Sequence, residues 1–208
     1  MKNILLTGAN GFLGRNILKN LKSSNNILET DLHNLDITNF DKCEKFFKKR
    51  KIDVIIHAAA AKGAAESFNN PKKYIDVNFY GTLNLLEMMR IRKIKKIIFI
   101  SSSGIYGRPK NNVNENADKN PFNPYSLGKN LSETLINYYS THYDIKYVNI
   151  RPNLISGHGL TQDNLIYDIV KSVLNNQDAV VFGKGTHVRQ YTHPDDISSF
   201  IKIILKKK

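Results

Sequence analysis

The sequence predicts an α/β fold built around a doubly wound parallel sheet with helices on both faces. Short and nearly continuous apolar runs recur through the first 150 residues, as in strands that are buried on both sides. Helical stretches separate these runs, and strands that alternate with helices indicate right-handed βαβ units. A glycine-rich segment follows the first run, at the place where such sheets bind phosphates.

The expected elements follow in chain order. Strands are predicted at 4–6, 27–28, 54–56, 97–100 and 147–150, and the second and fifth of these are the least apolar. Helices are predicted at about 12–23, 39–50, 72–92 and 125–142. Beyond Arg151 we expect a loop, a helix near 162–175, a short strand at 180–182 and a final helix from about Pro194. We therefore divide the chain into a sheet domain, 1–155, and a small lobe, 156–208, at the carboxyl edge of the sheet.

Composition excludes several classes of protein. The 208 residues carry 31 Lys and Arg against 18 Asp and Glu, for a net charge of +13. The basic residues are spread along the chain and are mostly Lys, so we expect no nucleic-acid partner. The single cysteine, Cys43, excludes an internal disulfide framework, and we predict no metal site. No apolar run approaches the roughly 18 residues of a membrane span, and we expect a cytoplasmic protein with no membrane partner.

The segment 7–14, TGANGFLG, joins the first strand to the first helix. Its first glycine allows a tight turn, its second lets the backbone approach a pyrophosphate, and its third lets the helix pack on the strand. Amide groups at the helix start then hold phosphates, so we predict a Rossmann-like dinucleotide site, although glycines that merely form a turn remain the alternative. The residues predicted to bind the cofactor here are Gly8, Asn10, Gly11, Phe12, Leu13 and Gly14.

A carboxylate beyond the second strand is expected to bind the adenosine ribose. Asp31 lies 17 residues after the last glycine of the motif, and Asp36 and Ile37 are placed to reach the adenine. An acid at this point favours NAD because it repels the 2′-phosphate of NADP. Arg15 and His33 point towards NADP, which stays possible, and solvated loop carboxylates are the alternative interpretation.

Two further segments carry acid–base chemistry. Tyr125 and Lys129 are four residues apart in a predicted helix, so they share one face, and a nearby ammonium lowers the pKa of a phenol. Ser102, in SSSGIYG at 101–107, lies at the carboxyl end of the fourth strand, where a substrate would bind. A plain Ser/Gly turn is the alternative for the serine.

Together these motifs resemble those of the extended short-chain dehydrogenases/reductases of the NAD-dependent nucleotide-sugar epimerase/dehydratase family. The resemblance rests, in order, on TGANGFLG, HAAAA at 57–61, VNFYGTLNLLE at 77–87, SSSGIYG, YSLGK at 125–129 and VRQYTHPDD at 188–196. It implies that Tyr125 exchanges a proton with a sugar hydroxyl while hydride moves between the sugar and the nicotinamide. Lys129 would bond the nicotinamide ribose, and Ser102 would bridge the sugar and the phenol.

The resemblance also implies binding roles. The cofactor would lie over the small side chains of Ala58, Ala59 and Ala60, and Asn78 would brace the neighbouring helix and strand. Substrate-binding roles fall on Ser102, Ser103, Tyr125, Asn153 and Arg189, the last as the grip on a substrate phosphate.

The sequence departs from the family at several positions. Ser103-Gly104 replaces the Asp-Glu pair of dehydratases, and Gly104 also replaces the Cys of epimerase-reductases. Leu154 stands where the family has a substrate-binding Asn, unless Asn153 has taken over that role. Family members also continue well beyond position 208, so the substrate lobe is expected to be incomplete.

We therefore expect a nucleotide-sugar 4-epimerase that acts through a transient 4-keto intermediate. A 4-reductase that consumes NAD(P)H and a non-catalytic cofactor-binding protein are the alternatives. The partners are a nucleotide-sugar substrate and a second copy of the chain. The homodimer is expected to form a four-helix bundle through Leu83, Leu86, Leu131 and Leu135.

Overall fold

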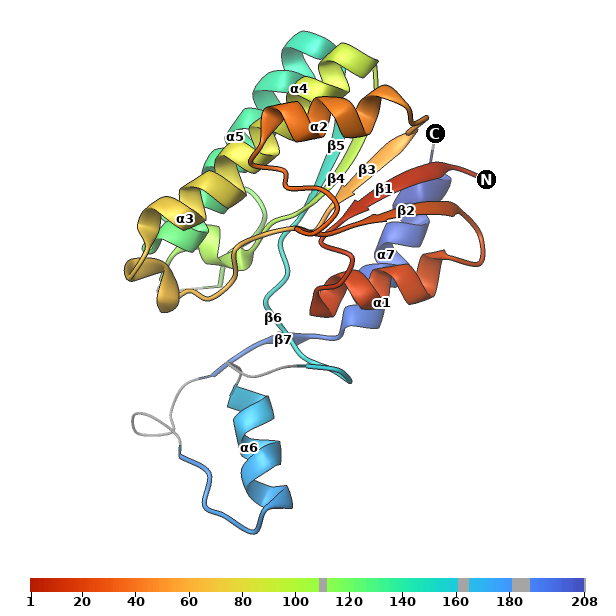
Figure 1. The fold of residues 1–208 in the computed structure, drawn as a ribbon. Coiled ribbons are helices and arrows are strands. Elements are labelled where there is room, and N and C mark those ends of the chain that lie inside the picture. Colours follow the sequence, from red (N-terminus) through yellow and green to blue (C-terminus); the bar gives the residue numbers. More distant parts are fainter. Residues whose placement is uncertain (109–111, 161–164, 181–187, 208) are drawn as a thin grey trace.

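The computed structural model describes residues 1–108, 112–160, 165–180 and 188–207, and its centre is a five-stranded sheet (Figure 1). The strands are β1 (Asn3–Thr7), β2 (Asn26–Thr30), β3 (Val54–His57), β4 (Lys96–Ile100) and β5 (Lys146–Ile150). They lie in the order β2-β1-β3-β4-β5, and every neighbouring pair is parallel. All five carboxyl ends therefore meet at one edge. The predicted α/β fold is confirmed.

Helices bury both faces of this sheet. One face is covered by α2 (Phe40–Lys48), α4 (Gly81–Arg92) and α5 (Pro124–Tyr143), and the other by α1 (Phe12–Leu21) and α7 (Pro194–Lys206) (Figure 1). Side chains along a strand point alternately to the two faces. Leu5 and Ile55 accordingly pack under the first layer, whereas Ile4 and Ile56 pack under the second. Burial on both sides is the reason that the inner strands β1, β3 and β4 are mostly apolar, whereas the edge strands β2 and β5 are partly exposed and more polar.

The helical stretch predicted at 72–92 is interrupted. It consists of α3 (Pro71–Ile75), a π-helical turn, η2 (Asp76–Tyr80), and α4. A π turn inserts one extra residue into a helix and often marks a functional site. Here the turn contains Asn78, whose side chain is buried.

The chain beyond β5 leaves the sheet and returns to it at α7. Strands β6 (Leu154–Ile155) and β7 (Tyr191–Thr192) form a short parallel pair beyond the carboxyl edge, and α6 (Leu165–Leu174) lies further out with no buried residue (Figure 1). The sequence did not predict β6 or β7. The strand expected at 180–182 forms no strand at Val180, and its other two residues lie outside the described part of the chain.

Helix α7 packs on α1 and completes the second core, although the sequence division placed it in the lobe 156–208. His193 caps its start by accepting a hydrogen bond from the amide of Asp195. At its end, the ammonium groups of Lys2 and Lys96 donate to the carbonyls of Leu205 and Ile204. No helix in the described ranges is long and apolar enough to cross a membrane.

Candidate functional site

A cleft of about 2170 Å³ opens at the carboxyl edge of the sheet. The sequence motifs meet there although they are far apart in the chain. Most of the predicted site residues line the cleft: Gly8, Gly11, Phe12, Leu13, Gly14, Ala58, Ala60, Ser102, Ser103, Tyr125, Lys129, Asn153 and Arg189. The remaining predicted residues, Asn10, Asp31, Asp36, Ile37, Ala59 and Asn78, lie behind or beside this lining.

The glycine loop brings its backbone close to the sheet and to α1. Gly8 has a φ of +70°, and a Cβ there would lie 2.7 Å from the amide nitrogen of Ala59. A Cβ on Gly14 would lie 2.0 Å from the carbonyl oxygen of Gly8, so only glycine fits. Helix α1 begins directly after Gly11 and has no acidic residue in its first turn. Its amide groups thus form a positive end that faces the cleft and suits a pyrophosphate.

The acidic residues beyond β2 organise their own loops. The Asp31 carboxylate accepts hydrogen bonds from the Asn10 amide and from the backbone amide of His33 at 2.9 Å, so it links the glycine loop to the end of β2. Asp36 accepts from the hydroxyl of Thr38 at 2.7 Å. Ile37 is buried in the core against Gly81. Of the three residues, Asp31 lies beside the glycine loop, and neither Asp36 nor Ile37 lines the cleft.

A chain of hydrogen bonds under the cleft fixes the tautomer of the buried His57. The Thr82 hydroxyl donates to the Asn78 carbonyl at 2.6 Å, so it accepts from Nε2 of His57 at 3.1 Å. Nδ1 is therefore bare and accepts from the Thr7 hydroxyl at 2.8 Å. Burial, together with the charge of Lys129, lowers the pKa of His57 to about 3. The imidazole is neutral and joins β1, β3 and α4.

The same chain supports the alanine segment after β3. The Thr7 hydroxyl accepts from the amide of Ala59 at 3.2 Å. The side-chain oxygen of Asn78 accepts from the amide of Ala61 at 2.8 Å. Asn78 thus acts from behind the cleft, where it ties the π turn to the segment that contains Ala58 and Ala60. The sequence did not single out His57, Thr7 or Thr82 as individual site residues, because their role depends on contacts between strands.

Helix α5 and strand β4 bring the three predicted catalytic residues together. Asn123 caps α5 by accepting from the amide of Ser126, and Tyr125 follows in the first turn. The Tyr125 phenol lies near the hydroxyl of Ser102, and both residues line the cleft. The Ser102 side chain caps the 3-10 turn η3 (Ser103–Tyr106). The Lys129 ammonium donates to the Ile100 carbonyl at 2.7 Å and lies 4.7 Å from the centre of the Phe99 ring.

Burial dominates the pKa values of this pair. It raises the pKa of the Tyr125 phenol, and the nearby Ser102 hydroxyl opposes part of that rise. This direction is opposite to the lowering that the sequence predicted from a neighbouring cation. Burial lowers the pKa of Lys129 to about 7, and the negative charge of Glu133 works against that change. The ammonium therefore titrates near neutral pH.

The outer wall of the cleft contains the predicted substrate residues. Asn153 donates to the side-chain oxygen of Gln190 at 2.8 Å, and Arg189 lies exposed at the same wall. A Cβ on Gly104 would lie 2.6 Å from the Ser126 hydroxyl and 3.2 Å from that of Ser102. The position therefore leaves no room for an acid or a thiol while these serines stay in place. Among the described residues, no group of three or more His, Cys, Asp or Glu side chains could hold a metal ion.

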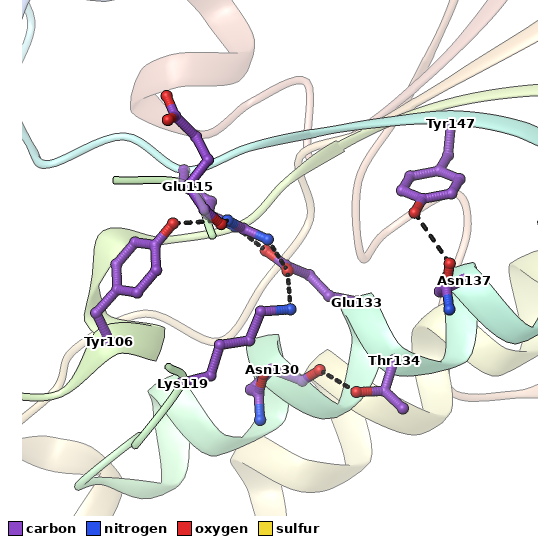
Figure 2. Close-up of polar contacts among 9 residues, drawn as sticks. Tyr106, Glu115, Lys119, Asn130, Glu133, Thr134, Asn137 and Tyr147 are labelled. Carbon is purple, nitrogen blue, oxygen red and sulfur yellow. Dashed lines mark hydrogen bonds and ion pairs between the residues drawn. The ribbon is translucent and has the colours of Figure 1, made fainter. Parts of the chain in front are cut away.

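The sequence did not predict a buried ion cluster that lies next to these residues. Glu133, one helical turn beyond Lys129, forms ion pairs with Arg151 and Lys119 in the wall of the cleft. Figure 2 shows Glu133 with Lys119. One signal was present in the sequence: Tyr125, Lys129 and Glu133 are spaced four apart and so share a helix face. Its partners could not be found, because they come from segments 14 and 18 residues away.

Comparison with known proteins identifies the family. The family model described as NAD dependent epimerase/dehydratase family matches residues 4–208. The chain belongs to this family. It is therefore related to enzymes, and its fold and motifs are those of the family.

Individual relatives differ in activity. A UDP-glucuronate 4-epimerase of Thermodesulfobacterium geofontis is 33% identical over 87% of this chain and 55% of its own length. A dTDP-D-glucose 4,6-dehydratase of Dictyostelium discoideum is 30% identical over the whole chain and 56% of its own length. The chain thus spans little more than half of either relative.

A solved structure shows the same fold. The UDP-glucuronic acid 4-epimerase of Bacillus cereus, in complex with UDP-glucuronic acid and NAD, has a TM-score of 0.88 and 28% identity. The match covers 99% of this chain and 74% of that one. The fold that surrounds the cleft is therefore shared by a protein that binds a dinucleotide and a nucleotide sugar.

Proposed function

We propose that the chain binds NAD and catalyses 4-epimerisation of a nucleotide sugar through a transient 4-keto sugar. The observation that carries the proposal is the convergence of Ser102, Tyr125 and Lys129 at the cleft that the glycine loop also lines. The family and the B. cereus complex support this assignment. The alternatives are NADP as the cofactor and net 4-reduction as the reaction, and cofactor consumption distinguishes reduction from epimerisation.

The residues present fit a dinucleotide. A positive helix end and the glycines at 8, 11 and 14, which have no Cβ, suit a pyrophosphate. Asp31 lies at the end of β2, where a carboxylate suits the ribose hydroxyls. Ala58 and Ala60 leave room for a flat ring over the sheet edge. When bound, NAD supplies the acceptor and donor of hydride at C4 of its nicotinamide.

The protein residues handle the proton. The Ser102 hydroxyl orients the sugar hydroxyl against the Tyr125 oxygen, which accepts the O–H proton as the carbon–oxygen bond gains double-bond character. The ammonium of Lys129, on the same helix face, would stabilise the phenolate form that this step requires against the rise in phenol pKa that burial causes. Once the keto sugar has turned over in the cleft, Tyr125 would return the proton to the same oxygen, which together with the hydride from bound NAD completes the epimer. No net oxidation or reduction remains.

Gly104 and Ser103 distinguish this reaction from dehydration. Loss of water from the sugar needs an additional acid and base near C5 and C6. The resemblance places these groups at positions 103 and 104, where this chain has a hydroxyl and a glycine pressed against Ser126. These two positions favour epimerisation over dehydration.

The experiment is a screen of UDP-, dTDP-, GDP- and CDP-sugars with NAD present, followed by NMR of the products. We expect one sugar to be converted into its C4 epimer without net formation or use of NADH. Tyr125→Phe should lower turnover by about 10²–10⁴-fold and keep the fold. Stoichiometric use of NAD(P)H would establish a reductase instead, and binding of NAD without any turnover would favour a non-catalytic protein.

We also propose a homodimer through α4 and α5. The structure changes the residues expected at this interface, because Leu86 is buried in the core of its own chain and Leu83 and Leu135 pack against that core. Leu131, the fourth expected residue, is half-buried. The exposed apolar side chains of α4, α5 and the adjoining η2 are Ile91, Leu127, Tyr138, Tyr143 and Tyr80. Light scattering of the wild type should give twice the 23.7 kDa mass of one chain, whereas Tyr138→Glu should give the mass of a monomer.

A further inference from the structure

The Glu133 cluster, formed by Glu133, Arg151, Lys119 and Tyr106, joins four segments of the chain at the wall of the cleft. The carboxylate of Glu133 accepts from Nε and Nη2 of Arg151 at 2.9 and 2.8 Å, and from the ammonium of Lys119 at 2.9 Å (Figure 2). Only 2% of Glu133 is exposed. A buried carboxylate with a two-pronged arginine partner and a second cation is a strong and directional contact.

Arg151 extends this contact to the loops. Its Nη1 donates to the Tyr106 hydroxyl at 2.6 Å and to the Glu115 carbonyl at 2.8 Å. Tyr106 ends η3, and Glu115 belongs to the segment 112–119, most of which lines the cleft. One buried anion on α5 therefore holds the end of η3 and the segment 112–119 through a single guanidinium.

The cluster acts on the same loop that carries Ser102. Turn η3 begins directly after Ser102, which lines the cleft together with Tyr125 of α5. This end of the turn is pressed against α5, since a Cβ on Gly104 would lie 2.6 Å from the Ser126 hydroxyl and 3.2 Å from that of Ser102. Its other end is held by Tyr106 and Arg151 to Glu133, also on α5. Residues of α5 that lie about two helical turns apart thus hold both ends of the loop 102–106. A shift of the far end would move the Ser102 hydroxyl relative to the phenol.

We propose that Glu133 is a positioning residue: through Arg151 it holds the Ser102 loop in register with Tyr125 and Lys129. The proposal rests on the proposed function for its kinetic effect and on the geometry of the loop for its structural effect. Misplacement of a reacting group by about 1 Å can cost about 10²-fold in rate, whereas binding of the dinucleotide depends on the glycine loop elsewhere. The effect should therefore fall on kcat.

The chain offers a matched control for the chemistry of this cluster. Glu87, on α4, accepts from Nε and Nη2 of Arg90 at 3.0 and 2.7 Å and from the hydroxyl of Tyr139. It is also a carboxylate held by an arginine and a tyrosine, but neither it nor its partners line the cleft. Glu87→Gln should therefore change stability without changing kcat.

The experiment compares Glu133→Gln, Tyr106→Phe and Glu87→Gln in kcat, KM and NAD affinity, with hydrogen exchange of the segments 101–107 and 112–119. We expect kcat to fall by about 10–100-fold in Glu133→Gln. A smaller fall of about threefold to tenfold is expected in Tyr106→Phe, which removes one hydroxyl and leaves the ion pair intact. NAD affinity should stay within about twofold, and exchange of both segments should rise in Glu133→Gln but not in Glu87→Gln.

The outcomes separate the two proposals. Unchanged kcat in Tyr106→Phe and Glu133→Gln, or an equal loss in Glu87→Gln, would overturn the positioning role and leave the proposed function intact. If the wild type converts no sugar nucleotide, the proposed function fails, and the hydrogen exchange alone decides whether Glu133 holds the loop. If Glu133→Gln does not fold, kcat and hydrogen exchange of Tyr106→Phe decide whether the cluster positions the loop.

Discussion

The buried imidazole of His57 should make the folded protein sensitive to acid. Its pKa is lowered from 6.5 to about 3 by burial and by the charge of Lys129. In the unfolded chain the group keeps its ordinary pKa. Between pH 6.5 and 3 the unfolded state therefore binds one more proton than the folded state, and the free energy of unfolding falls as the pH falls.

The magnitude follows from the pKa difference. From pH 6.5 to pH 4 the unfolded chain gains about 1.36 kcal/mol per pH unit from this single group, which is about 3 kcal/mol in all. The hydrogen-bond chain explains why His57 does not take up this proton in the folded protein. A proton on Nδ1 would face the hydroxyl hydrogen of Thr7, and the Thr82 hydroxyl already uses its own hydrogen on the Asn78 carbonyl.

The assay is urea unfolding at pH 7, 6, 5 and 4, at one protein concentration, of the wild type and His57→Gln. The amide keeps a donor and an acceptor but does not titrate. We expect the variant to be less stable at pH 7 by about 1–3 kcal/mol and to lose about 3 kcal/mol less than the wild type on going to pH 4. Carboxylates such as Glu133 titrate in both proteins, so the difference isolates the imidazole. Equal slopes for the two proteins would refute the reasoning.

The remaining predictions concern the cofactor site. Gly14→Ala places a Cβ 2.0 Å from a backbone oxygen, so it should destabilise the fold by about 3 kcal/mol or more in urea unfolding; an unchanged midpoint would contradict the packing argument. Gly11→Val should keep the fold but abolish NAD binding in calorimetry, and unchanged affinity would count against the phosphate site. Asp31→Ala should weaken the affinity for NAD and leave that for NADP unchanged. If the wild type already binds NADP more tightly than NAD, the expected preference for NAD is wrong. Lys129→Met should lower turnover and NAD affinity together, whereas a loss of turnover alone would contradict the proposed contact of Lys129 with the ribose.

The sequence predicted the fold well because the signals were local. Apolar runs such as 97–100 matched β4 to the residue or nearly so, and the glycines marked a turn that no other residue could form. The π turn was missed because its extra residue changes no pattern of polarity. Strands β6 and β7 were missed because each has two residues and pairs across a gap of more than 30 in the chain.

The site was harder to predict, because its properties depend on burial and distant partners. The spacing of Tyr125 and Lys129 placed them correctly on one helix face, but not the direction of the phenol pKa, which burial controls. Ile37 was expected to reach the adenine, and its side chain is buried in the core. Leu86 was expected at a dimer surface, yet it faces the sheet. In each case the environment of the side chain, which one sequence does not contain, decided the outcome.

One face of α5 shows how a buried anion can serve a buried cation without bonding to it. Tyr125, Lys129 and Glu133 follow one another at intervals of four, a spacing at which a carboxylate and an ammonium readily pair. Both oxygens of Glu133 are instead taken by Arg151 and Lys119, while Lys129 gives one N–H to the Ile100 carbonyl. The carboxylate still raises the pKa of Lys129 against burial, so it favours the charged ammonium. Because Arg151 holds that carboxylate away, the ammonium keeps donors that can serve a ribose and a phenol. The ion cluster therefore sustains the charge on Lys129 without taking its hydrogen bonds.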